Sequence, residues 1–110
     1  MLVSEAVKIL EPLLMNQERF PISMKRGEES LGKVSAVGII PNKHAYLVSE
    51  RDRKVGAPCT IRQVYNILSQ ATECELLCHV EGKELGILNF SNGLSDMGCA
   101  MYFGGCSVFV

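Results

Sequence analysis

The sequence predicts one α+β domain over residues 1–110, with an antiparallel sheet of three hairpins and two helices packed on one face. Two segments repeat apolar residues at the helical spacing of three and four. Three pairs of strand-forming runs are each joined by turn residues. Helices that alternate with paired strands favour an antiparallel sheet covered on one side. The expected order is helix, hairpin, helix, hairpin, hairpin.

Composition places the chain among ordinary globular proteins. Hydrophobic residues make up 47% and charged residues 21% of its 110 residues, enough for a core without disulfides or metal. The net charge of −1 does not favour nucleic acid or a membrane surface as a partner. Glu5, Lys8 and Glu11 interrupt the apolar region that a signal peptide would need. We therefore expect a cytoplasmic protein with reduced cysteines and no cofactor.

The first helix is predicted from one apolar stripe, with Ser4 or Glu5 as the candidate cap. Pro12 lies inside the pattern and removes a backbone donor, which predicts either a kink or a second short helix that starts there. The helical segment should end near residues 20–21, because the residue before a proline avoids helical backbone angles. The stripe consists of Val3, Ala6, Val7, Leu10, Leu13 and Leu14.

The second helix is expected over residues 60–70. Thr60 at the N-cap and Gln63 three residues later form a capping box, in which each side chain can satisfy a backbone N–H. Cys59 and Val64 flank the cap at the positions of a hydrophobic staple.

The first hairpin is expected from two β-rich runs, residues 33–40 and 45–49, around the turn cluster 41–44. A short strand at residues 22–24 and a polar loop at 25–32 should precede it.

The second hairpin pairs residues 73–80 with 85–90 around a polar turn at 81–84. Apolar and polar residues alternate along its first strand, which predicts one buried face carrying Cys74, Leu76, Cys78 and Val80.

The third hairpin, residues 99–103 and 106–110, closes the chain around Gly104 and Gly105, a pair suited to a type I′ turn. Every side chain from Met97 to Val110 is uncharged, and both faces carry large apolar groups. Such a hairpin is either central in the sheet or a docking surface for another chain. The predicted interface residues are Met101, Tyr102, Phe103, Val108, Phe109 and Val110.

An alternative binding site is the small-residue loop 91–98, whose backbone amides could face an anion or a nucleotide phosphate. Phosphate loops normally lead into a helix, whereas a strand is expected here. The residues concerned are Ser91, Asn92, Gly93, Ser95, Asp96 and Gly98.

The segment Gly86–Ser91 resembles the strand before the ligand loop of poly(ADP-ribose) glycohydrolase-like macro domains. In that family the loop continues with proline, a glycine run and paired acidic residues. This sequence has Ser95, Asp96, Met97 and Gly98 instead, so the resemblance stays local and assigns no function.

The cysteines do not form a recognisable metal motif. On a strand, the sulfurs of Cys74 and Cys78 would lie roughly 13 Å apart, too far for one ion. A two-residue turn also places Cys99 and Cys106 out of register. Cysteine commonly serves as a small core residue, and we predict no metal ligands. Cys59, ahead of a helix N-terminus, is the one candidate for a reactive thiol.

No set of residues predicts catalysis. The leading hypothesis is a non-enzymatic interaction protein that self-associates or docks a protein partner through the closing hairpin. The first alternative is a small-molecule or nucleotide-binding domain that uses loop 91–98. A thiol-dependent enzyme that uses Cys59 is the second alternative.

Overall fold

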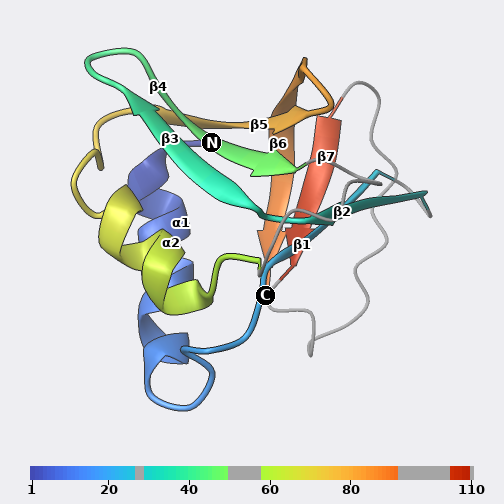
Figure 1. Cartoon of the computed structure of the whole chain (residues 1–110). Helices are drawn as coiled ribbons and strands as arrows, with labels where there is room; N and C mark the ends of the chain where they lie inside the picture. Colours follow the sequence, from blue (N-terminus) through green and yellow to red (C-terminus); the bar gives the residue numbers. More distant parts are fainter. Residues whose placement is uncertain (27–28, 50–57, 92–104, 110) are drawn as a thin grey trace.

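The computed structural model describes residues 1–26, 29–49, 58–91 and 105–109, which form the predicted α+β fold (Figure 1). Within these ranges the expected order of elements is only partly observed, because four strands, not one hairpin, follow the first helical segment. The elements are α1 (Val3–Leu10), the 3-10 helix η1 (Glu11–Leu14), β1 (Ser23–Arg26), β2 (Glu29–Lys33), β3 (Ala36–Ile40), β4 (His44–Ser49), α2 (Ile61–Leu68), β5 (Glu75–Val80), β6 (Lys83–Ser91) and β7 (Gly105–Phe109).

The strands form one mixed sheet in the order β2-β1-β7-β6-β5-β4-β3. Hairpins β3–β4 and β5–β6 are antiparallel, as predicted. The expectation of a purely antiparallel sheet is wrong, because β4 pairs with β5 and β6 pairs with β7 in parallel. The chain between β4 and β5 contains α2, and a connection of that length can return a strand in the same direction.

Strand β7 comes from the second half of the predicted closing hairpin. It lies between β1, to which it is antiparallel, and β6. The first half, residues 99–103, lies outside the described residues. The described chain therefore gives β7 a neighbouring strand on each side.

The N-terminal segment forms two successive helices, the second of the two structures predicted for it, but it ends at Leu14 and not near residues 20–21 as expected. Helix α1 ends at Leu10, and the 3-10 helix η1 continues with Pro12 in its first turn. Residue Leu2 is the N-cap, so the prediction of Ser4 as the cap is wrong. The Glu5 carboxylate accepts a hydrogen bond of 3.3 Å from the Leu2 N–H, because Glu5 occupies the third helical position.

Helix α2 confirms the predicted capping box. The Thr60 N–H donates to Gln63 Oε1 over 2.9 Å, and the Gln63 N–H donates to Thr60 Oγ1 over 3.2 Å. Cys59 packs against the buried core, and Val64 is part of that core.

The turn between β5 and β6 is tighter than predicted. It consists of Glu81 and Gly82, whose φ angles of 52° and 81° match a type I′ turn.

Strand β2 was not expected, because residues 25–32 read as a polar loop. Only Leu31 of this strand is buried, so it has no alternating pattern to detect. The register on β1 steps from Met24–Gly32 to Lys25–Ser30, which leaves Leu31 as the unpaired residue of a bulge.

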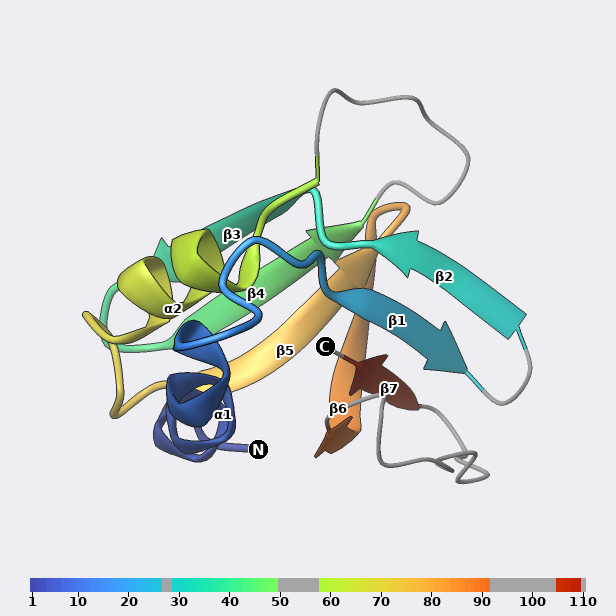
Figure 2. The ribbon, with the colours of Figure 1, turned by 90° about the horizontal axis from the view of Figure 1, so that it is seen from below.

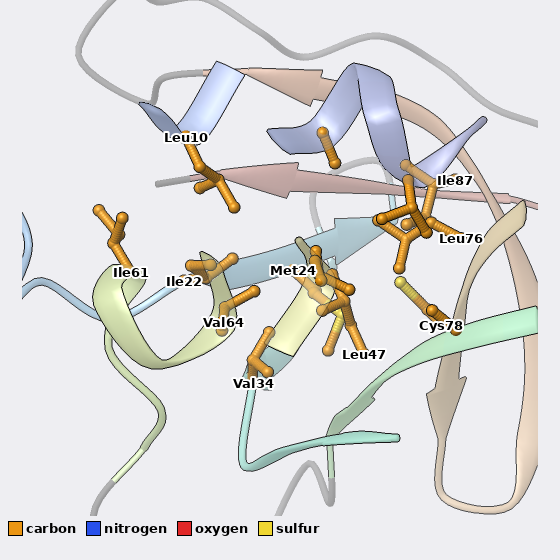
Figure 3. Close-up of a cluster of buried hydrophobic side chains, with 14 of the residues drawn as sticks. Leu10, Ile22, Met24, Val34, Leu47, Ile61, Val64, Leu76, Cys78 and Ile87 are labelled. Carbon is orange, nitrogen blue, oxygen red and sulfur yellow. The ribbon is translucent and has the colours of Figure 1, made fainter. Parts of the chain in front are cut away.

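The core lies between the helices and one face of the sheet, with both helices on the same side of β3, β4 and β5 (Figure 2). Side chains from α1, α2 and the strands point toward one another there (Figure 3). The sheet also curves enough to bring β2 beside β4, where the Ser49 hydroxyl donates to the Leu31 carbonyl over 2.6 Å. Fully buried members of the core include Val3, Leu10, Ile22, Met24, Val34, Leu47, Ile61, Val64, Leu68 and Leu76.

Candidate functional site

The residues predicted for loop 91–98 are only partly described. Ser91 is the last residue of β6, whereas Asn92, Gly93, Ser95, Asp96 and Gly98 lie outside the described residues. The ligand loop therefore stays a prediction.

The interface predicted on the closing hairpin is also only partly described. Val108 and Phe109 lie on β7, opposite Met24 and Ser23 of β1. The side chains of these two residues lie outside the described part of the chain. So do four further predicted interface residues, Met101, Tyr102, Phe103 and Val110. Because β7 is paired on both sides, its backbone edges cannot accept another strand.

The described cysteines are free thiols at three separate places. Cys74 precedes β5, and Cys78 is buried within β5. The described part of the chain contains no group of three or more His, Cys, Asp or Glu residues arranged to hold a metal ion.

Cys59 does not have the environment of an activated nucleophile. Burial raises the pKa of its thiol, because a thiolate loses solvation in an apolar surrounding. A reactive thiol needs the opposite shift, and the helix N-terminus that follows Cys59 does not outweigh burial.

We expect Cys59 to react with iodoacetamide at neutral pH at least about fivefold more slowly in the folded protein than in urea. Because burial stabilises the protonated thiol, the rate in the folded protein should rise as the pH is raised into the alkaline range. The tryptic peptide of residues 55–62 contains no other cysteine, so its mass reports the modification directly. Faster alkylation in the folded protein would restore the thiol-enzyme hypothesis.

The two edge strands of the sheet differ in how they are protected. Strand β2 carries Glu29 and Lys33, has the bulge at Leu31, and is tied to β4 through Ser49. Charges and bulges are devices by which proteins block pairing at a sheet edge. Strand β3 has neither: its five residues are uncharged, its register with β4 is continuous, and β4 is its one strand neighbour among the described residues.

Strand β3 also exposes apolar side chains. Ala36 is exposed and Ile40 is 43% exposed, whereas Val37 and Ile39 pack against the core from the other face. An uncharged strand with an open edge is a template for pairing with another strand. The signal in the sequence was the uncharged run 34–41, but only the strand order shows that it lies at an edge.

On the sheet face opposite the helices, side chains of β4 and β5 form a cluster next to edge strand β3. The Tyr46 ring lies 4.2 Å from the His79 ring and 5.9 Å from the His44 ring, measured between centroids. His79 Nε2 is 3.9 Å from a Glu84 carboxylate oxygen, so this pair is ionic only when the imidazole is protonated. Leu77, in register with Tyr46, is only 7% exposed. Tyrosine is among the residue types enriched where proteins contact one another.

A groove of about 730 Å³ lies where the β3–β4 turn meets the connection from α2 to β5. Ile39 and residues 41–43 form one wall, and residues 70–74 form the other. Lys43 and Glu73 therefore place opposite charges on opposite walls.

No helix in the described part of the chain has the length and hydropathy that crossing a membrane requires. Comparisons of the sequence with family models and with curated proteins, and of the fold with solved structures, found no match. The geometry of edge strand β3 and of the groove therefore carries the functional argument.

Proposed function

We propose that this chain is a non-enzymatic interaction protein that self-associates by pairing β3 with β3 of a second copy. The observation that supports this proposal is the difference between the two edge strands of the sheet. Edge β2 is charged, bulged and tied to β4, whereas edge β3 is uncharged, regular and partly exposed. Natural proteins usually protect such an edge, so one left open is best explained by a strand that pairs with it.

A second copy fits this edge because the sequence of β3 is self-complementary about Gly38. Antiparallel pairing on a two-fold axis places Gly38 opposite itself, as symmetric dimers require of one contact surface. Ala36 then lies opposite Ile40 of the second copy, and Val37 opposite its Ile39. Each pair keeps its own face of the sheet, and no like charges meet.

The length of β3 sets the expected strength. Five residues span about 17 Å, and a contact of that length falls at the small, transient end of protein interfaces. We therefore expect a dimer with a dissociation constant of roughly tens to hundreds of micromolar. A cytoplasmic location, where thiols stay reduced, is part of the proposal and is supported by Cys59, Cys74 and Cys78, which are free thiols in the described part of the chain.

Sedimentation velocity over a concentration series tests the edge directly. The wild type and Ile40→Val should form a concentration-dependent dimer, because both keep an apolar β-branched side chain at the edge. Ile40→Lys should weaken the dimer at least about tenfold, because a lysine on an edge strand opposes pairing. Met15→Lys is the matched control: Met15 is 87% exposed and lies outside the sheet, so its dimerisation should be unchanged.

Two results would contradict the proposal. One is a strict monomer at concentrations near one millimolar. The other is a dimer that withstands Ile40→Lys but is lost on Phe103→Lys, since that outcome places the interface on the closing hairpin.

A further inference from the structure

We propose that the groove between the β3–β4 turn and the α2–β5 connection binds a small zwitterion. Its cationic group would contact Glu73 and its anionic group Lys43. The groove shares Ile39 with edge strand β3, but Lys43 and Glu73 lie outside that strand, so ligand binding is tested independently of the dimer. At about 730 Å³ the groove falls within the range of small-molecule sites in proteins.

The first wall is held in shape by its turn. The Lys43 N–H donates to the Ile40 carbonyl over 3.0 Å, which closes the turn around Pro41 and Asn42. Proline fixes its own φ, and Asn42 adopts a φ of 62°, a combination typical of a type II turn. Lys43 therefore projects from a backbone that is already ordered before any ligand arrives.

The second wall is held by the N-terminus of the chain. The Val3 N–H donates to the Cys74 carbonyl over 2.9 Å, and the Ser4 N–H donates to the Thr72 carbonyl over 3.2 Å. These bonds fix the backbone on both sides of Glu73. A ligand that bridges two ordered walls loses less free energy to the ordering of loops than one that must fold them.

The chemistry of the groove selects the ligand class. Lys43 and Glu73 are exposed, and neither forms an ion pair with another described residue. Ile39, Pro41 and Ala71 add apolar surface to the lining of the same groove. Sites of this kind combine apolar lining with a few polar groups that fix orientation. A molecule with one positive end, one negative end and a short apolar middle satisfies all three features.

A homologous series of amino acids tests the proposal and measures the charge spacing. Glycine, 4-aminobutyrate and 6-aminohexanoate are titrated to roughly 20 mM against ¹⁵N-labelled protein, with butylamine and butyrate as single-charge controls. At least one zwitterion should give saturable shifts at residues 42–43 and 70–74. Shifts with none of them, or equal binding of a single-charge control, would overturn the proposal.

Variants separate a specific site from general charge attraction. Lys43→Gln and Glu73→Gln should each weaken binding at least about fivefold, because each removes one end of the contact. Exchanging the two residues, as Lys43→Glu with Glu73→Lys, should restore binding, since a zwitterion can lie in the groove in the opposite direction. Lys83→Gln and Glu11→Gln, which remove exposed charges outside the groove lining, should leave it unchanged. A charge exchange that abolishes binding would contradict the assigned contacts.

Discussion

Leu47→Ala is expected to lower the free energy of unfolding by about 2–5 kcal/mol, the range for large cavities in well-packed cores. Leu47 has no solvent exposure and lies at the centre of β4. It is in register with Val37 of β3 on one side and Cys78 of β5 on the other. Removing its side chain therefore leaves a void between two strands and the helices that cover them.

Urea denaturation followed by circular dichroism measures this loss. Because small domains are typically stable by only about 5–15 kcal/mol, the variant can lose much of its folded population. Leu47→Met, which keeps the volume, should cost less than about 1.5 kcal/mol and remains measurable. Val48→Ala is the control on the same strand: its side chain points to the other face and is half-buried, so its loss should be clearly smaller. Equal losses at Leu47 and Val48 would contradict the assignment of the core to the helix-covered face.

The sequence predicted those parts of the fold that depend on neighbours in the chain. The capping box at Thr60 and Gln63 uses two residues three apart, and it is present. Hairpins β3–β4 and β5–β6 each join strands that follow one another directly, and their turns contain Asn42 and Gly82, residue types that tolerate positive φ. Pro12 marked the change from α1 to η1. In each case the controlling atoms lie within a few residues of one another.

The parts that were missed depend on contacts between distant segments. Pairing of β4 with β5 joins two hairpins in parallel, and nothing within either hairpin determines that direction. Insertion of β7 between β1 and β6 pairs residues 107–109 with residues 23–25, about eighty positions earlier in the chain. Strand β2 was missed for a different reason. Its partner β1 directly precedes it in the chain, but only Leu31 of β2 is buried, so the segment lacks the alternating pattern of a strand.

Both proposed sites arise from those long-range contacts. The residues of β3 were predicted as a strand, but its position at the edge follows from the order of all the others. The two walls of the groove lie about thirty residues apart in the sequence, and they meet because β4 and β5 pair. A search for local motifs cannot identify either one.

Ser49→Ala is expected to cost about 1–3 kcal/mol, the penalty for leaving a buried polar group without its partner. Ser49 is 1% exposed, and its hydroxyl donates to the Leu31 carbonyl over 2.6 Å. Leu31 is the bulge residue that has no register partner on β1, and we therefore expect its carbonyl to depend on this hydroxyl for a donor. The same bond joins β2 to β4 across the curve of the sheet.

Ser35→Ala is the matched control for this bond. The Ser35 hydroxyl donates to the Val48 carbonyl over 3.1 Å, but that carbonyl also accepts the Ser35 backbone N–H over 2.8 Å. Its removal leaves no carbonyl without a donor and should cost less than about 1 kcal/mol. Hydrogen exchange shows which strand is destabilised. Ser49→Ala should increase amide exchange in β2 more than in β5, because the lost bond holds β2. Equal stabilities of the two variants, with unchanged exchange in β2, would mean that the curvature holds β2 beside β4 without the serine.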